Sequence, residues 1–434
     1  MPSKSVYVAK KWIFSQHNLK NKGIEEYYDK HNIPKNGITC TAGNMEKLKT
    51  AFHFGADAVY LAGKRYGLRA FADNFSDEEI VEAVQYAHSL GKKVYVTLNI
   101  FAKNSDFDTL ADYLSLLEKA QVDAVLVSDV GVLDFVRSHS KLRVHVSTQA
   151  NTTNAYAVGF WSKMGAERVV LAREMSMQDI AETHRRYPDV QLECFVHGAM
   201  CISYSGRCLL SNYLTSRDSN RGECVQACRW KWTVREVSRE DSLPVEEDSR
   251  GTYIFNSKDM NMLAHLQDFA NAGVVSLKIE GRMKSPFYVA TVVNAYRRAL
   301  DALYNGTLTQ NLVQTLNSEL DKASHREYTT GFYYHEEESR QYYNDSKAVE
   351  EYKFIAVVRQ VLDGKIVVEQ RNRFVVGDCL ETLSNTEFSS KNFVIREISD
   401  ETGNTVQVAN RVQQILTINC PYKLSVGDIL RRKN

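Results

Sequence analysis

The sequence predicts an α/β protein: a (β/α)8 TIM-barrel-like domain with a cysteine-rich insertion, followed by a small all-β barrel domain. Eight short apolar runs alternate with amphipathic stretches after residue 37, as in a parallel sheet covered by helices. A segment with four cysteines interrupts this alternation between the seventh and eighth runs. After residue 350 the apolar residues alternate with polar ones, and turn sequences separate the runs, which indicates antiparallel strands.

Composition narrows the class of protein. The chain has 434 residues, a formal net charge of +1, 44% hydrophobic residues and 25% charged residues. This is ordinary globular composition and excludes disordered, collagen-like and coiled-coil classes. No apolar run reaches the ~18 residues of a spanning helix, and the first residues lack a secretory signal, so we expect a cytoplasmic protein without a membrane partner. The eight cysteines are then expected to be thiols or metal ligands rather than disulfides.

The first elements are a basic N-terminal extension over residues 1–36 and the barrel over 37–285. Several barrel helices end at a glycine, as at Gly55 and Gly91, which is the residue preferred just after a helix C-terminus. A doubly wound open sheet is the alternative, because a sequence does not report whether a sheet closes. The eight predicted strands are 38–42, 58–62, 93–101, 124–128, 143–148, 168–172, 191–196 and 275–279.

The cysteine-rich insertion occupies residues 198–262, where we predict a hairpin of 231–237 with 252–256 around an acidic, solvated loop. A helix over 262–272 and the last barrel strand follow. Ser285 and Pro286 predict an N-cap and first helical position, which begin a helical connector over 286–350. Residues 351–434 are the predicted C-terminal β-barrel, with strands at 354–358, 365–369, 379–382, 393–398 and 406–408.

Four cysteines of the insertion are candidate metal ligands: Cys201, Cys208, Cys224 and Cys228. Two close pairs within one polar segment are typical of a chain that offers four thiolates to one metal centre. The second pair fits the spacing of zinc sites, whereas the first pair does not. The irregular spacing favours a 4Fe–4S cluster, with Zn as the alternative. The remaining cysteines are expected to be core thiols: Cys40, Cys194, Cys379 and Cys420.

Polar residues lie at the C-terminal ends of the predicted strands, where barrel enzymes keep their chemistry. They are Asn44, Asn99, Asp129, Gln149, Arg173, Glu174, His197, Lys278, Glu280 and Arg282. Helix capping is an equal explanation for Asn44 and Asp129. Arginine recognises carboxylates in a bidentate manner, which favours Arg173 and Arg282 for an anionic ligand.

We therefore predict catalytic roles for four of these residues: His197, Arg173, Lys278 and Glu280. Substrate-binding roles are predicted for Asn44, Gln149, Arg282, His325 and Arg326. The last two lie outside the barrel. They are expected either to cover its mouth or to belong to a packed loop between the domains.

The sequence ECFVHGAMC at 193–201, followed by GRCLLS at 206–211, matches the signature of the collagenase-like peptidase family. Further matching segments are 42–44, 55–60, 147–149, 171–174, 277–284 and 325–332. The chain therefore resembles this family over residues 37–434. Its C-terminal domain makes it similar to the family's prephenate-dependent tRNA hydroxylation proteins. Thr41 departs from the pattern, because the family commonly has proline there.

This resemblance implies an oxygen-independent, iron–sulfur-dependent tRNA uridine hydroxylase that makes 5-hydroxyuridine at the wobble position. It further implies a 4Fe–4S cluster on cysteines, prephenate as co-substrate and tRNA as partner, and it leaves a paralogous family subunit open as a further partner. Cys228 is the natural fourth ligand here, although some relatives use a later cysteine.

The alternative function is a collagenase-like peptidase, a hydrolase that cleaves peptide bonds. The chain has neither an H-E-x-x-H nor a G-x-S-x-G sequence, which known peptidases and hydrolases use. Four thiolates on a cluster also suit redox chemistry better than hydrolysis. Hydroxylation is therefore the preferred prediction.

Two regions are candidate RNA contacts. The first is a set of basic residues in the C-terminal domain: Arg371, Arg373, Arg431, Arg432 and Lys433. A merely solvated face is the alternative there. The second is RWKW at 229–232, which combines cations with stacking surfaces. The alternative for this segment is that its tryptophans pack beneath the cluster.

Overall fold

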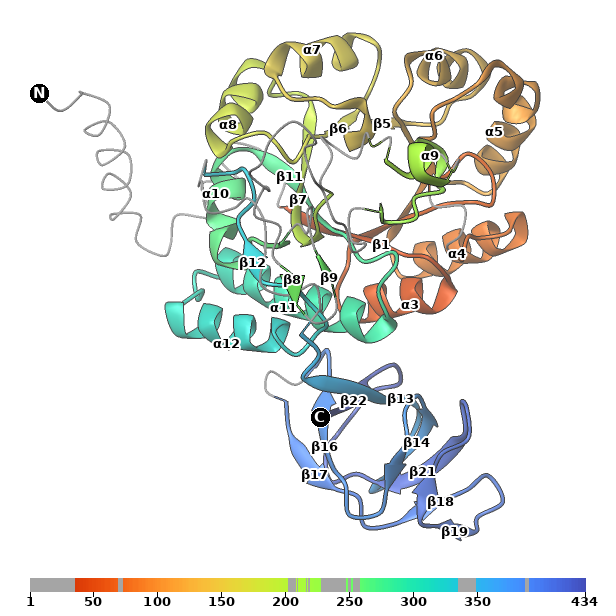
Figure 1. Ribbon diagram of the computed structural model, residues 1–434, viewed down its shortest axis with the longest axis vertical. Helices are drawn as coiled ribbons and strands as arrows, with labels where there is room; N and C mark the ends of the chain where they lie inside the picture. The colour runs from red at the N-terminus through yellow and green to blue at the C-terminus, as the bar shows by residue number, and fades with distance from the viewer. Residues whose placement is uncertain are drawn as a thin grey trace, which may run out of the picture.

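Eight parallel strands form a closed ring in the computed structural model (Figure 1). They are β1 (Gly37–Thr41), β2 (Ala58–Leu61), β3 (Lys93–Leu98), β4 (Ala124–Val127), β5 (Val144–Val146), β6 (Arg168–Val170), β7 (Gln191–Ala199) and β11 (Val274–Ile279). Each strand pairs with the next, and β11 pairs with both β7 and β1. The predicted barrel is therefore confirmed, and the open sheet is excluded.

The structure describes most of the chain. The described residues are 36–68, 73–201, 208, 210–215, 217, 219–227, 247–248, 251–252, 258–334, 349–386 and 390–434. Within these segments no helix is long and apolar enough to cross a bilayer.

Helices surround the ring, and side-chain caps fix where several of them begin. Asn44 accepts a hydrogen bond from the backbone N–H of Lys47 at 3.0 Å, and Asp129 accepts one from Val132 at 3.0 Å. The covering helices are α3 (Met45–His53), α4 (Asp77–Ser89), α5 (Leu110–Lys119), α6 (Val130–His139), α7 (Ala155–Lys163), α8 (Met177–Arg186), α10 (Leu266–Asn271) and α11 (Pro286–Tyr304). Single 3-10 turns are η1 (Asn104–Thr109), η2 (Thr148–Ala150), η4 (Ser219–Arg221) and η6 (Leu263–His265).

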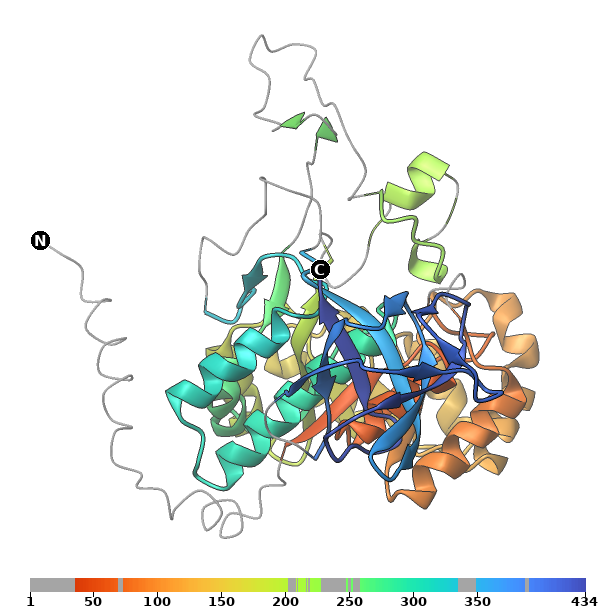
Figure 2. The same cartoon turned by 90° about the horizontal axis from the view of Figure 1, so that it is seen from below.

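The insertion leaves the barrel where β7 ends. Figure 2 shows its described parts, α9 (Leu210–Thr215) and the antiparallel pair β8 (Glu247–Asp248) and β9 (Gly251–Thr252), standing off one end of the barrel. The hairpin predicted from 231–237 and 252–256 falls mostly outside the described residues. The chain returns through β10 (Asp259–Asn261), which pairs antiparallel with β7 and parallel with β12 (Tyr328–Thr329).

The predicted helix over 262–272 is shorter than expected. The structure has a 3-10 turn followed by α10, and the strand β10 immediately precedes them. Hydrogen bonding to the end of β7 holds Asp259–Asn261 extended, and the backbone N–H of Met262 donates to the carbonyl oxygen of Val196 at 2.9 Å, so Met262 is bound to β7 and does not begin a helix. This tertiary pairing is not encoded in the local apolar spacing, so the sequence pattern did not show it.

The C-terminal domain is antiparallel and all-β, as predicted. Its eight-stranded sheet has the order β17-β16-β22-β13-β14-β21-β18-β19 and curls around its own apolar core (Figure 1). The strands are β13 (Tyr352–Leu362), β14 (Lys365–Gln370), β16 (Cys379–Leu383), β17 (Asn392–Val394), β18 (Ile398–Ser399), β19 (Thr405–Val406), β21 (Ile415–Asn419) and β22 (Ile429–Lys433). A separate ribbon pairs β15 (Phe374–Val375) with β20 (Val408–Ala409).

The two domains are joined by apolar packing and by buried ion pairs. Val357, Leu383 and Ile429 of the C-terminal domain belong to the apolar cluster of the barrel. The fully buried Arg431 forms ion pairs with Glu381 of its own domain and with Glu319 of α12 (Gln310–Leu320). Since Arg431 is one of the residues proposed as a basic RNA contact, the structure corrects that prediction: its guanidinium is enclosed between the domains.

Candidate active site

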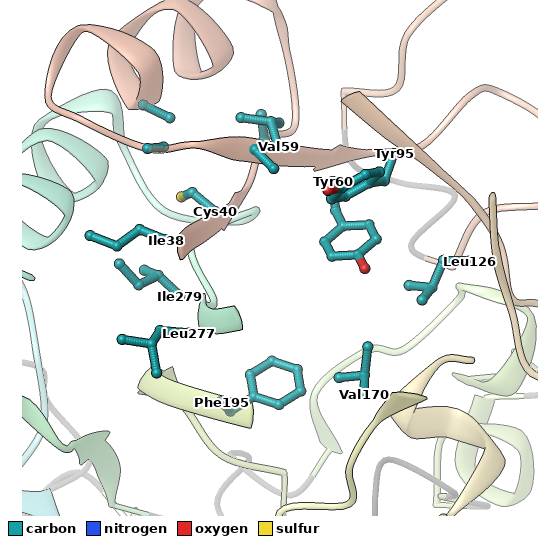
Figure 3. Close-up of a cluster of buried hydrophobic side chains, with 14 of the residues drawn as sticks. Ile38, Cys40, Val59, Tyr60, Tyr95, Leu126, Val170, Phe195, Leu277 and Ile279 are labelled. Carbon is teal, nitrogen blue, oxygen red and sulfur yellow. The ribbon is translucent and has the colours of Figure 1, made fainter. Parts of the chain in front are cut away.

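The barrel strands present alternate side chains to the interior and to the helices. Figure 3 shows Tyr60, Val170 and Phe195 turned into the space that the strands enclose, whereas Cys40 and Ile279 face outward. This follows from the two-residue period of a strand.

A buried ionic cluster occupies the barrel interior. The fully buried Glu193 of β7 receives a hydrogen bond from Arg168 of β6, with Nη1 at 3.1 Å from Oε2. Nζ of Lys278 of β11 lies 3.3 Å from Oε1 of the same carboxylate. It also lies 3.7 Å from the centre of the Tyr60 ring, a cation–π contact. Burial lowers the pKa of Lys278, and the opposing attraction of Glu193 raises it.

Tyr60 and His145 extend this cluster toward the other side of the interior. The Tyr60 hydroxyl lies 2.9 Å from Nδ1 of His145 in β5 and 3.4 Å from Oε2 of Glu193. Burial raises the pKa of Tyr60, so the phenol stays protonated. Burial, followed by the charges of Arg168 and Lys278, lowers the pKa of His145 well below its usual value, so the imidazole is neutral.

Arg173 follows β6 and lies over the ring of Phe195, with the guanidinium carbon 4.0 Å from the ring centre. Among the residues that the structure describes, no carboxylate pairs with it. A half-buried guanidinium held by an aromatic face, beside the ammonium group of Lys278, is suited to an anion with carboxylate groups. The structure thus places Arg173 and Lys278 at the same end of the barrel, as predicted.

Two side-chain oxygen atoms at this end have no hydrogen-bond partner among the described residues. Oδ1 of Asn99 and Oγ1 of Thr97 are buried, and neither has a hydrogen-bond partner. The Asn99 amide donates to Oγ of Ser147 at 3.2 Å. Gln149, predicted to bind substrate, lies next to Ser147 in η2, directly after β5. Buried polar atoms of this kind normally bind water or a ligand.

His197 does not lie in the barrel mouth, contrary to our expectation. The pairing of β11 with β7 passes from Lys278–Phe195 to Ile279–His197, so one residue of β7 is skipped. This bulge reverses the alternation of side chains. The His197 ring instead contacts Tyr288, Tyr296 and Tyr328, with ring centres 6.0, 5.4 and 5.4 Å away. Burial lowers the pKa of His197 to about 3, so it is a weak base.

Glu280 and Arg282 lie in the loop after β11. The carboxylate of Glu280 accepts a hydrogen bond from the backbone N–H of Arg282 at 3.3 Å, and the Arg282 guanidinium donates to Oδ1 of Asn74. Asn44 is close by and donates to Asp73 at 3.2 Å in addition to capping α3. These residues are therefore at the mouth, but Asn44 is occupied as a cap.

His325 and Arg326 lie in the packed loop that was the alternative to a cover over the mouth. The His325 ring stacks on Tyr328, with ring centres 4.4 Å apart, and its Nδ1 lies 2.8 Å from the carbonyl oxygen of Ala323. Arg326 forms an ion pair with the buried Asp259, with Nη1 3.8 Å from Oδ1. These contacts place both residues beside His197, outside the ring of strands.

The cysteines predicted to be metal ligands are described in part. Cys201 and Cys224 are exposed thiols and Cys208 is half-buried, whereas Cys228 and the RWKW segment lie outside the described residues. The sulfurs of Cys208 and Cys224 each accept a backbone N–H, from Leu210 and Gln226, at 3.4 Å. Such N–H···S bonds are typical of thiolates bound to iron–sulfur clusters. Within the described segments no three potential ligands gather in one place.

The other basic residues of the C-terminal domain are divided between ion pairs and the surface. Arg371 pairs with Glu369 at 2.8 Å and with Glu46, and Arg432 pairs with Asp378. Arg373 and Lys433 are exposed. The predicted basic surface is therefore smaller than the sequence indicated, because Arg371, Arg431 and Arg432 form ion pairs with carboxylates of the chain itself.

The sequence pattern did not single out the four residues of the buried ionic cluster: Glu193, Arg168, His145 and Tyr60. Glu193, His145 and Tyr60 lie inside predicted apolar strands, and Arg168 lies at the N-terminal end of one, away from the C-terminal ends where site residues were expected. The available signal was a charged or polar residue at an inward-facing position of an otherwise apolar run, since ionisable residues are rarely buried without a partner.

Both domains match profiles of the same protein family. The profile of "Peptidase family U32" matches residues 43–342, and that of the "Peptidase family U32 C-terminal domain" matches residues 350–431. The chain is 38% identical over 403 residues to tRNA hydroxylation protein P1 of Bacillus subtilis, which covers 91% of this chain and 94% of that protein. It is 34% identical over 448 residues to tRNA hydroxylation protein P of Escherichia coli, covering 92% and 96%. It is 33% identical over 308 residues to a collagenase of Porphyromonas gingivalis, covering 68% and 73%.

Proposed function

The chain belongs to peptidase family U32, and on that basis we propose that it is an RNA-modifying enzyme that hydroxylates the wobble uridine of tRNA. The observation that carries the proposal is its similarity, over nearly the full length of both chains, to relatives named tRNA hydroxylation proteins. We propose tRNA as its macromolecular partner, with a paralogous family subunit as a further one.

Prephenate is the proposed co-substrate. It carries two carboxylate groups, and Arg173 and Lys278 offer two cations at the same end of the barrel. The buried oxygens of Asn99 and Thr97 can accept hydrogen bonds from a hydroxyl group beside them. This combination of fixed cations and unpartnered acceptors suits a small, polar dianion.

We propose that Cys201, Cys208, Cys224 and Cys228 hold a 4Fe–4S cluster, with Zn as the alternative. The sulfurs of Cys208 and Cys224 each accept a hydrogen bond from a backbone N–H, which supports a thiolate at both positions. A bound cluster supplies one-electron transfer. The chain itself would bind and orient the co-substrate through Arg173 and hold or move a proton at Nζ of Lys278.

Metal analysis tests this cofactor. Full-length protein purified without oxygen is expected to be brown and to contain about four iron and four sulfide per chain, as a cubane cluster requires. Cys208→Ser should lose most of this iron. Cys420→Ser is the matched control, because that thiol is buried in the separate C-terminal core. A colourless protein with one zinc per chain would refute the cluster.

Nucleoside analysis tests the reaction. In a strain that lacks its own hydroxylation proteins and grows without oxygen, this chain is expected to restore 5-hydroxyuridine-derived nucleosides in tRNA, measured by mass spectrometry. Growth without oxygen removes oxygen-dependent routes to the same product. Unchanged tRNA at normal levels of folded protein would contradict the proposed function.

Peptide hydrolysis is the second candidate, and similarity to the collagenase of Porphyromonas gingivalis favours it. Hydrolysis by a side-chain nucleophile needs an effective base beside that nucleophile. The signature histidine, His197, is surrounded by tyrosine rings and has a pKa of about 3, which does not suit this role. Digestion of gelatin by the pure protein, lost on a point substitution, would restore this alternative.

A further inference from the structure

A polar cavity of about 50 Å³ opens at the N-terminal end of the barrel, opposite the proposed active site. Its volume exceeds the ~10–15 Å³ that a cavity measured in this way needs to hold one water molecule. Three of its lining residues are the first residues of barrel strands, which fixes its position in the ring. The lining residues are Lys93, Tyr95, Asp123, Arg143, His145, Glu167, Arg168 and Gln191.

We propose that His145, Tyr60 and Glu193 form a proton relay that connects Lys278 with this cavity. The proposal rests on the proposed function in one respect, namely that Lys278 exchanges a proton with a reacting group. It adds that this proton reaches solvent through the N-terminal end of the barrel, whereas substrate binds at the C-terminal end.

An ion pair and two hydrogen bonds link the members of the relay. Nζ of Lys278 lies 3.3 Å from Oε1 of Glu193, Oε2 of Glu193 lies 3.4 Å from the Tyr60 hydroxyl, and that hydroxyl lies 2.9 Å from Nδ1 of His145. His145 lines the cavity. The 3.4 Å step is long for a hydrogen bond, but such contacts often shorten when substrate binds.

The protonation states suit transfer in both directions. His145 is neutral and can accept at one ring nitrogen while it donates from the other. Tyr60 is a protonated phenol placed between two acceptors. The ring of Tyr95 also contacts His145. Four cations lie near enough to disfavour a lasting imidazolium: Arg168, Lys278, Arg143 and Lys93.

The transfer conserves protons. Lys278 passes a proton from Nζ to Oε1 of Glu193 and takes one from the reacting group in its place. Rotation of the carboxyl group presents the proton to Tyr60, whose own hydroxyl proton moves to Nδ1 of His145. His145 releases its Nε2 proton to the cavity. One proton therefore enters at Lys278 and one leaves at His145. The imidazole then carries its proton on Nδ1, and it returns to the Nε2–H tautomer before the next transfer in the same direction.

Lys278 has little contact with bulk water at the C-terminal end. Lys278 is 4% exposed, and its Nζ is flanked by the rings of Tyr60 and Phe195, at 3.7 and 5.4 Å from their centres. A bound substrate would cover this end further. An exit on the opposite face lets proton transfer continue while the mouth is closed.

Chemical rescue tests the relay. Purified variants are added to an oxygen-free extract of the hydroxylation-deficient strain, which supplies co-substrates, and the rate of tRNA hydroxylation is measured. His145→Ala is expected to slow the reaction about a hundredfold, the scale of a lost proton-transfer group. Added imidazole should raise the rate of this variant at least tenfold. With substituted imidazoles, the rescued rate should vary with the pKa of the added imidazole. A slow variant that no imidazole rescues would overturn the relay.

Tyr60→Phe removes the central hydroxyl but keeps the ring that contacts Lys278, so it is expected to slow the reaction by a similar factor, without rescue by imidazole. Tyr113→Phe is the matched control, because it removes a buried hydroxyl of α5 that has no hydrogen-bond partner among the described residues. Full activity of Tyr60→Phe would contradict the relay even if His145→Ala fails to fold.

A second measurement separates the relay from the proposed function. In ¹⁵N-histidine-labelled full-length protein, Lys278→Met should shift the ring-nitrogen signals of His145. In a Tyr60→Phe background this shift should fall to the part that the charge of Lys278 causes directly. An unchanged His145 would refute the relay in any event. If wild-type protein does not hydroxylate tRNA but the coupled shift is present, the relay stands and the proposed reaction fails.

Discussion

Lys278→Met is expected to reduce tRNA hydroxylation by about a hundredfold to a thousandfold, the usual effect of removing one preorganised charged group from an active site. Methionine retains the length of the side chain beside Tyr60 and Phe195 but supplies neither a charge nor a proton. Nucleoside mass spectrometry of tRNA, with the amount of folded protein measured in parallel, checks this result.

Two controls separate a loss of chemistry from a loss of folding. Glu193 keeps Arg168 as a partner in Lys278→Met, so the variant should stay folded and retain its iron content. Lys49→Met removes a half-exposed ion pair with Glu82 on the outside of the barrel and should hydroxylate tRNA at the wild-type rate. Wild-type activity of Lys278→Met would remove Lys278 from the reaction.

Arg431→Met is expected to lower the free energy of unfolding by about 3–5 kcal/mol, the cost of leaving buried carboxylates without their partner. Arg431 is fully buried and neutralises both Glu319 and Glu381 at the boundary between the domains. Lys322 remains beside both carboxylates, which favours the lower half of that range. Denaturant unfolding measures the effect. Arg359→Met is the surface control, because its pair with Glu369 is exposed and such pairs contribute about 1 kcal/mol or less.

The effect of Arg431→Met should also depend on pH. Burial raises the pKa of Glu319, but Arg431 and Lys322 lower it more, so the folded pKa lies below the usual value. A depressed carboxyl pKa stabilises the fold above the unfolded pKa, near 4.3, and this contribution is lost as the pH falls through the folded value. The difference between wild type and variant is therefore expected to shrink below about pH 4. A constant difference from pH 7 to pH 3 would contradict this electrostatic explanation.

The sequence pattern predicted the barrel because buried parallel strands are nearly continuous apolar runs, which local spacing detects. It predicted Arg173 and Lys278 at the C-terminal end of the barrel because the strand ends meet there regardless of loop conformation. It failed at His197, where a bulge between β7 and β11 reverses the side-chain direction. Such a bulge is a property of the pairing of two strands, so one strand alone does not reveal it.

The positions of charged residues were harder to predict, because they too depend on pairing between distant segments. Glu193 and His145 lie within apolar runs, and their polar contacts depend on which strands lie opposite them in the ring. The basic neighbours of Arg431 in β22 predict a surface cation at this position. Its burial follows from the docking of α12 against the C-terminal sheet. In each case the decisive partner is remote in the chain, where periodicity carries no information.

The closure of the barrel has a consequence for how the protein folds during synthesis. The strand that completes the ring, β11, pairs with β7 and β1 and leaves the ribosome after the whole cysteine-rich insertion. Until then the first seven strands have two open edges, at β1 and β7, that can pair with other chains. The nascent protein therefore exposes its cysteines before its ring is sealed, and chaperone protection in that interval would favour correct closure.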